Sequence, residues 1–186
     1  MKIILILLLC LCSFSAKAKV KVAFFEAYDY TGEVIRLLPK SEFFHVAIQI
    51  EGVWYHTDQE DGVTVLKPFK NFSYLGPEYK LKAILFNESI DISQSSIAPF
   101  LGLPFDFYYN WFDDTTVCCT ELVAKLIDIE PSQSFFASQY WEPASGLKRG
   151  GLGISPDELY TELLKRGFQI ERFDFKGSKN MCKAFL

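Results

Sequence analysis

Histidine is scarce in this chain, and long apolar runs are absent after its first residues. Only two histidines occur among 186 residues, so a site that needs an imidazole base has few candidates. No stretch beyond the N-terminal segment is apolar enough to cross a bilayer as a helix. The sequence also has no internal repeat, low-complexity tract or linker, which indicates a single folded unit.

Acidic residues outnumber basic residues in the chain as a whole. Lys and Arg total 19, whereas Asp and Glu total 23, which gives a formal net charge of −4. Proteins that bind nucleic acids usually concentrate positive charge. The acidic balance therefore argues against a nucleic acid partner.

The one long apolar run lies at the N-terminus and predicts a secretory signal peptide. Met1-Lys2 gives a short positive start, Ile3 to Leu11 are almost all apolar, and Ala16-Lys17-Ala18 fits the small-x-small cleavage rule. The run is too short for a membrane-spanning helix, which disfavours an uncleaved anchor. We expect a signal over residues 1–18 and one mature domain over 19–186. Without Lys2 and Lys17 that domain has a formal charge of −6, and its expected location is secreted or periplasmic.

Cysteine is sparse, and its number is odd once the signal is removed. Three of the five cysteines remain, namely Cys118, Cys119 and Cys182. An exported chain with an odd number keeps at least one free thiol or forms an intermolecular bridge. A disulfide scaffold usually has an even set in a shorter chain, so a free thiol is the first chemical indication in the sequence.

Runs of β-branched and aromatic residues in the first half of the chain predict antiparallel strands. These strands are expected at Val20–Phe25, Phe43–Ile50, Val53–Thr57, Val63–Leu66 and Tyr79–Phe86. The second half predicts helices and loops before a last strand, at Ser93–Leu101 (helix), Phe105–Asp114 (aromatic loop), Thr116–Ile127 (helix), Ser132–Gly153 (loop), Ser155 to about Arg166 (capped helix) and Phe168–Phe173 (strand). The sequence therefore predicts an α+β fold.

Both histidines fall on one predicted hairpin. His45 lies on its first strand, His56 lies on its second, and Glu51-Gly52 forms the turn. A two-residue turn pairs residues whose numbers sum to about 103, so His56 faces Ala47 and is a diagonal neighbour of His45. We expect the two rings to meet on one face, although a single histidine is more often a satisfied core or surface residue.

Cys118 and Cys119 lie near the start of the predicted helix 116–127. The free N–H groups and the dipole at a helix N-terminus favour a thiolate and can hold the oxyanion of an acyl-transfer intermediate. Adjacent helical residues point about 100° apart, so one thiol faces the site while the other packs or pairs with Cys182. Glu121 and Asp106 are interpreted as a capping and a loop-anchoring carboxylate.

These residue types predict a nucleophile and its base. Cys119 is the expected nucleophile, His45 the base, and His56 the group that orients the base through its other ring nitrogen. Asp58 is a less favoured orienting group. Zinc bound by the same cysteines and histidines is an alternative, but their spacing fits no zinc motif, so neither a metal nor another cofactor is expected.

Six short motifs resemble those of one enzyme family. They are Phe44-His45-Val46-Ala47-Ile48, His56, Asp61-Gly62-Val63, Gly102-Leu103-Pro104-Phe105-Asp106, Cys119-Thr120-Glu121-Leu122-Val123 and Ser155-Pro156-Asp157-Glu158-Leu159. Their order resembles the circularly permuted NlpC-like papain-fold cysteine hydrolases, especially the YiiX- and YebB-like branch, and more distantly the lecithin:retinol acyltransferase-like enzymes. In ordinary papain-like chains the cysteine helix precedes the histidine strand. The chain departs from the family in lacking Pro-Gly-Asp before His45 and in carrying Cys118 beside the matched nucleophile.

The resemblance implies a circularly permuted papain-like fold and matches Cys119, His45 and His56 to nucleophile, base and third residue. It implies an amidase or peptidase that works through a thioester, and export makes peptidoglycan peptides a candidate substrate. The aromatic run from Phe107 to Phe112 would suit a lipid ester or amide instead, if it lines a groove rather than the core. A zinc-binding or catalytically inactive binding module is the alternative from another functional class.

Overall fold

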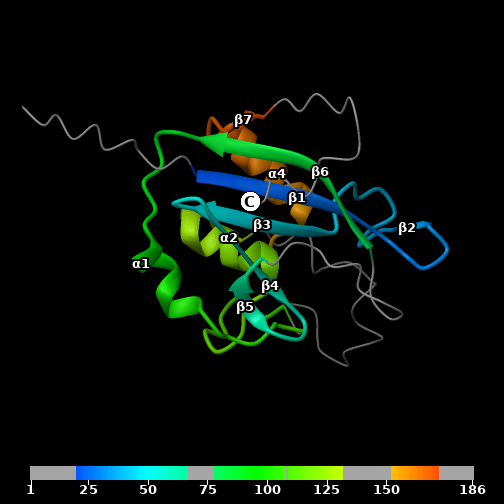
Figure 1. Ribbon diagram of the computed structural model, residues 1–186, viewed down its shortest axis with the longest axis horizontal. Coiled ribbons are helices and arrows are strands. Elements are labelled where there is room, and N and C mark those ends of the chain that lie inside the picture. The colour runs from blue at the N-terminus through cyan, green and yellow to red at the C-terminus, as the bar shows by residue number, and fades with distance from the viewer. Residues whose placement is uncertain (1–19, 67–77, 108, 132–151, 172–186) are drawn as a thin grey trace, which may run out of the picture.

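The computed structural model of the chain (Figure 1) describes residues 20–66, 78–107, 109–131 and 152–171. The predicted signal peptide, Cys182 and most of the predicted loop 132–153 lie outside the described residues. No helix among the described residues is long and apolar enough to cross a membrane.

A seven-stranded sheet forms the centre of the molecule. The strands are β1 (Val20–Tyr28), β2 (Val34–Ile35), β3 (His45–Ile50), β4 (Val53–Asp58), β5 (Gly62–Val65), β6 (Glu78–Asn87) and β7 (Gln169–Ile170). Their order is β5-β4-β3-β1-β6-β7, and β2 pairs with β1 outside this path. Every pair of named strands is antiparallel. The α+β prediction is confirmed, although the sequence did not predict β2, and the predicted strand 168–173 is described only as the short β7.

The helices are α1 (Gln94–Ile97), the 3-10 helix η1 (Ala98–Phe100), α2 (Cys119–Ile127) and α4 (Pro156–Lys165). The helix expected from Thr116 begins three residues later because Val117 forms a bridge with Phe105. Cys118 then has extended backbone angles, φ −92° and ψ 171°, and is the N-cap of α2.

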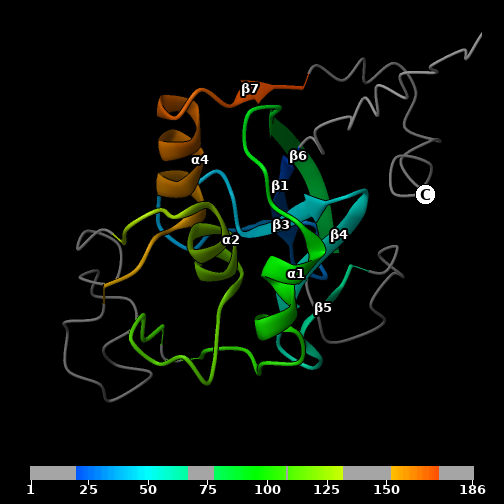
Figure 2. The ribbon, with the colours of Figure 1, turned by 90° about the vertical axis from the view of Figure 1, so that its left-hand side faces the viewer.

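Helices α2 and α4 cover the same face of the sheet (Figure 2). Alternate residues of β3, Val46, Ile48 and Ile50, join the main core with residues of both helices. Ala47 points to the opposite face, where it packs in a smaller cluster with Phe25 and Trp54. Because side chains alternate along a strand, His45 lies on the face of this smaller cluster.

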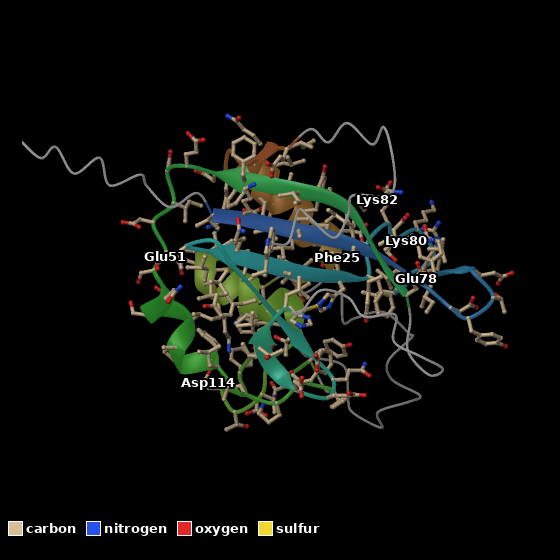
Figure 3. All side chains as sticks on the ribbon, viewed as in Figure 1. Phe25, Glu51, Glu78, Lys80, Lys82 and Asp114 are labelled. Carbon is tan, nitrogen blue, oxygen red and sulfur yellow. The ribbon has the colours of Figure 1, made fainter. Side chains whose placement is uncertain are left out.

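Charged side chains pair with one another along the outer part of β1 and β6, where Lys80 and Lys82 lie (Figure 3). Lys82 Nζ is 2.8 Å from a carboxylate oxygen of Glu26, and Lys80 Nζ lies 3.9 Å from the centre of the Tyr28 ring. These residues therefore form mixed pairs on the sheet surface and not a positive patch.

The hairpin of β3 and β4 has the predicted register. Its turn residues Glu51 and Gly52 have φ values of 49° and 84°, and two successive positive φ values are typical of the two-residue turns that match strand twist. The paired residues are Ile48–Tyr55, Gln49–Trp54 and Ile50–Val53. The described ladder ends there, so β3 and β4 diverge at the end that carries both histidines.

A loop before α2 is fixed against β5. The Leu103 carbonyl accepts the Val63 N–H at 2.9 Å, and the Gly102 N–H donates to Val63. The next carbonyl, that of Pro104, accepts the Val117 N–H at 3.0 Å. Two of the sequence motifs, Asp61-Gly62-Val63 and Gly102-Leu103-Pro104-Phe105-Asp106, are thereby joined, and the loop sets the position at which α2 begins.

Candidate functional site

His45 and His56 meet at the divergent end of the hairpin. His45 Nε2 is 3.1 Å from His56 Nδ1, and the two rings are nearly perpendicular, with an interplanar angle of 86°. Both residues are buried, with exposed fractions of 6% and 9%. The structure brings the two sequence-predicted histidines into direct contact, as the hairpin register predicted.

The His45 ring lies among aromatic side chains. Its centre is 5.3 Å from that of Tyr79 on β6 and 6.0 Å from that of Phe25 on β1. Burial, together with the neighbouring His56, lowers the pKa of His45 to about 3. His45 is therefore a neutral imidazole at ordinary pH, the form that can accept a proton.

Cys119 is the first residue of α2, and its side chain is part of the main core between α2 and the sheet. Backbone hydrogen bonds from Val46, Thr120 and Cys119 itself reach its sulfur. Because Val46 directly follows His45, these bonds bring the sulfur against the strand segment that carries the histidine. The sulfur of Cys119 therefore lies beside the β3 backbone at the residue that follows His45.

The backbone N–H groups near the start of α2 favour the Cys119 thiolate, as expected, but they are not the largest effect on its pKa. The three backbone hydrogen bonds favour the thiolate, but burial outweighs them and raises the pKa of the thiol to about 11. Only 9% of the residue is exposed, so water cannot solvate the charge. At rest, the Cys119 thiol and the His45 imidazole are both neutral.

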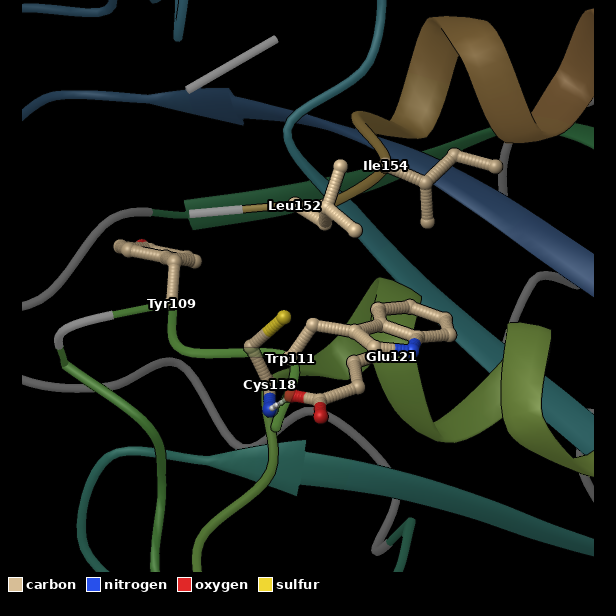
Figure 4. A pocket seen from close by; sticks show the side chains of 7 residues that line it. Tyr109, Trp111, Cys118, Glu121, Leu152 and Ile154 are labelled. Carbon is tan, nitrogen blue, oxygen red and sulfur yellow. Dashed lines mark hydrogen bonds between the residues drawn. The ribbon is translucent and has the colours of Figure 1, made fainter. Parts of the chain in front are cut away.

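Cys118 has a different environment from Cys119. Its sulfur is 3.4 Å from Thr120 Oγ1 and points into a small pocket (Figure 4), lined by Tyr109, Trp111, Glu121, Leu152, Gly153 and Ile154. Burial raises the pKa of Cys118 far above its usual range. Both thiols are free in the described part of the chain, and the predicted alternative of a Cys118–Cys182 pair lies outside it.

Glu121 and Asp106 have the structural roles that the sequence indicated. A carboxylate oxygen of Glu121 accepts the Cys118 N–H at 3.2 Å, and the other lies 3.0 Å from Lys125 Nζ. Asp106 is 1% exposed and accepts the Asn110 N–H. One carboxylate satisfies the backbone N–H of Cys118 itself and the other that of Asn110 in the preceding loop, and so they fix the entry to α2.

A carboxylate from α4 holds the segment that leads into β3. Asp157 Oδ1 accepts the Glu42 N–H at 2.8 Å, and Ser155 and Glu158 form a reciprocal capping box at the same helix start. The predicted capped helix is thus confirmed. Its additional effect, fixing the chain three residues before His45, was not visible in the sequence.

Two tyrosines lie near the cysteines, of which sequence reasoning named Tyr109 only as part of the aromatic run and did not select Tyr79. Tyr79 contacts the His45 ring, and burial raises the pKa of its phenol well above the usual range. Tyr109 has an unusual positive φ of 53° and lines the Cys118 pocket. Neither has a motif of its own, and only the register of β6 and the shape of the loop bring them to this place.

The aromatic run divides between surface and interior. Phe107 and Phe112 are 53% and 72% exposed, whereas Tyr109 and Trp111 line the Cys118 pocket. The run is therefore neither entirely core nor entirely surface.

In the described part of the chain, no three His, Cys, Asp or Glu side chains are grouped so that they could hold a metal ion. The alternative of a zinc site made of cysteines and histidines therefore has no support from the described residues. Comparisons of the chain with protein-family models, curated proteins and solved structures found no match.

Proposed function

We propose that the chain is a cysteine hydrolase that cleaves an amide or ester bond through a thioester on Cys119. The observation that carries the proposal is the junction of α2 and β3. There a thiol at a helix start reaches the backbone beside His45, whose ring is hydrogen-bonded to His56. This arrangement of nucleophile, base and orienting group is typical of acyl transfer on unrelated folds.

The chemistry starts from the neutral pair. His45 takes the thiol proton as the sulfur attacks the carbonyl carbon, so that no isolated thiolate has to exist in the buried site. The N–H of Cys119 at the open end of α2 donates to the oxyanion. His45 then gives the proton to the leaving amine or alcohol, and water or another acceptor cleaves the thioester.

The order of elements supports a circularly permuted papain-like architecture. The histidine strand β3 precedes the cysteine helix α2, and α2 packs on the sheet that contains β3. Two motifs that resemble those of the NlpC-like hydrolases also lie side by side, since the Gly62 and Leu103 segments are hydrogen-bonded to each other. The second segment is linked in turn to the start of α2 by the hydrogen bond between Pro104 and Val117.

The proposed substrate class is a peptide or acyl compound that meets the enzyme outside the cytoplasm. The predicted signal peptide favours an exported enzyme, for which peptidoglycan peptides are available substrates. The exposed Phe107 and Phe112 favour the second candidate, a lipid ester or amide. Incubation with purified peptidoglycan and with N-acyl lipids distinguishes the two by the masses of their products.

The central test is covalent trapping with an activated acyl ester such as p-nitrophenyl acetate. We expect one acetyl group on Cys119, measured by peptide mass, because a substrate-like ester requires His45 and the oxyanion donors as well as a thiol. Cys119→Ala should abolish this adduct. Cys118→Ala is the matched control because its thiol faces the separate Tyr109–Trp111 pocket, and it should keep the adduct.

Two results would contradict the proposal. An adduct that survives Cys119→Ala and disappears in Cys118→Ala would make Cys118 the reactive thiol. The absence of any adduct in the folded protein, confirmed by its thermal transition, would favour a catalytically inactive binding module.

A further inference from the structure

Asp58 lies directly behind the histidine pair. It follows His56 by two residues along β4, so its side chain is on the same face of the strand. One carboxylate oxygen, Oδ2, is 3.8 Å from His56 Nε2. The other oxygen, Oδ1, accepts the N–H groups of Glu60 at 2.8 Å and Asp61 at 2.6 Å. The turn therefore holds the carboxylate while its second oxygen faces the imidazole.

This geometry decides where the ring protons belong. A carboxylate only accepts hydrogen bonds, so it favours a proton on His56 Nε2. His56 Nδ1 is then an acceptor for the proton on His45 Nε2, at the observed 3.1 Å. The second nitrogen of His45, Nδ1, consequently keeps its lone pair and can receive a proton.

We propose that Asp58 is a positioning residue that, through His56, fixes His45 in the tautomer able to deprotonate Cys119. The inference rests on the proposed function and extends it from three residues to a series of four: Cys119, His45, His56 and Asp58. One proton moves, from the Cys119 sulfur to His45 Nδ1 and later to the leaving group. The protons on His45 Nε2 and His56 Nε2 stay where they are.

The charge that develops in this step also meets Asp58. When His45 becomes an imidazolium, its Nε2–H bond to His56 strengthens, and the negative charge of Asp58 stabilises the pair. Tyr79 contacts the His45 ring, and burial raises the pKa of its phenol, so the phenol is uncharged near neutral pH. Burial also raises the pKa of the Cys119 thiol on the neighbouring helix. Asp58, 3.8 Å from His56, therefore supplies the negative charge among these three groups.

The scarcity of histidine makes the tautomers measurable. The chain has two histidines, both in this site, so ¹⁵N-histidine labelling gives a spectrum without other imidazoles. We expect long-range ¹H–¹⁵N correlations to report a proton on Nε2 of both rings in the native chain near neutral pH. A proton on His56 Nδ1, or a mixture of tautomers, would overturn the proposal without the need for any variant.

Asp58→Asn provides the second test. An asparagine keeps an oxygen for the turn but presents an NH₂ donor to His56 Nε2, which reverses the hydrogen-bond direction through both rings. His45 Nδ1 then carries a proton and cannot accept one from the thiol. We expect both tautomers to invert and acylation of Cys119 to slow about 10- to 100-fold, with folding checked by the thermal transition.

Asp29→Asn is the matched control. Asp29 Oδ1 also accepts turn N–H groups, those of Thr31 and Glu33, but Asp29 is half-buried and has no described contact with a histidine. Acylation should be unchanged in this variant. Unchanged tautomers and rate in Asp58→Asn would contradict the role of Asp58. Correct tautomers with no acylation in the native chain would instead contradict the proposed function.

Discussion

At the scale of single residues, the buried state of Cys119 determines how its thiol should react. Backbone donors at the start of α2 favour the anion, yet desolvation is the larger effect, so the pKa of the thiol lies near 11. In the proposed mechanism, the thiol and the imidazole therefore start as a neutral pair, and the proton moves only during attack on the substrate.

This neutral pair predicts a specific pH profile for alkylation. Iodoacetamide reacts with the thiolate, so we expect labelling of Cys119 to be slow at pH 6 and to rise about tenfold per pH unit from pH 7 to 10. Peptide mass spectrometry of the Cys118→Ala variant measures the label on Cys119 without interference from the adjacent thiol. A rate that is already high at pH 6 and constant to pH 9 would show an ionised pair.

At the scale of the elements, the contact between β5 and the loop before α2 depends on the absence of a side chain at Gly62. Gly62 has a φ of 66°, and a Cβ at this position would lie 2.2 Å from the Leu103 carbonyl oxygen. That distance is far below van der Waals contact. Backbone would have to move, and the same loop sets the start of α2 through Pro104 and Val117.

Gly62→Ala should therefore destabilise the protein and also slow the acylation of Cys119. We expect a loss of about 1–3 kcal/mol in the free energy of unfolding, measured by urea titration, with a slower reaction in the fraction that remains folded. Gly32→Ala is the control because Gly32 has a φ of 85° with nothing near its would-be Cβ. Equal losses in the two variants would mean that the Leu103 contact is unimportant.

The sequence predicted the hairpin of β3 and β4 because its information is local. Two turn residues and the alternation of side chains fix the register, and that register brings His45 and His56 together. The pKa of Cys119 and the contact of Tyr79 with His45 were not predictable in this way. Both depend on which distant elements cover the site, and no local pattern carries that information.

At the scale of the whole molecule, the neutral His45 links the site to acid stability. Its pKa falls from 6.5 to about 3 on folding, so between these values the unfolded chain binds a proton that the folded chain does not. The free energy of unfolding therefore decreases as the pH falls through this window, by up to about 1.4 kcal/mol per pH unit.

Replacing His45 should reduce this sensitivity to acid. We expect the free energy of unfolding of His45→Gln to fall less steeply than that of the parent chain between pH 6.5 and pH 4. Urea titrations at several pH values measure both slopes, and the carboxylates that the two chains share cancel in the comparison. Parallel slopes would show that His45 is not buried in its neutral form.

The hydrogen bond from Glu42 to Asp157 also bears on when activity can arise during biosynthesis. The two residues are 115 positions apart, so a nascent chain cannot complete the support of β3 until nearly all of it has been made. Cys119 itself emerges well after the hairpin. If the predicted signal directs the extended chain across a membrane, this hydrogen bond can form only after both segments have arrived on the far side.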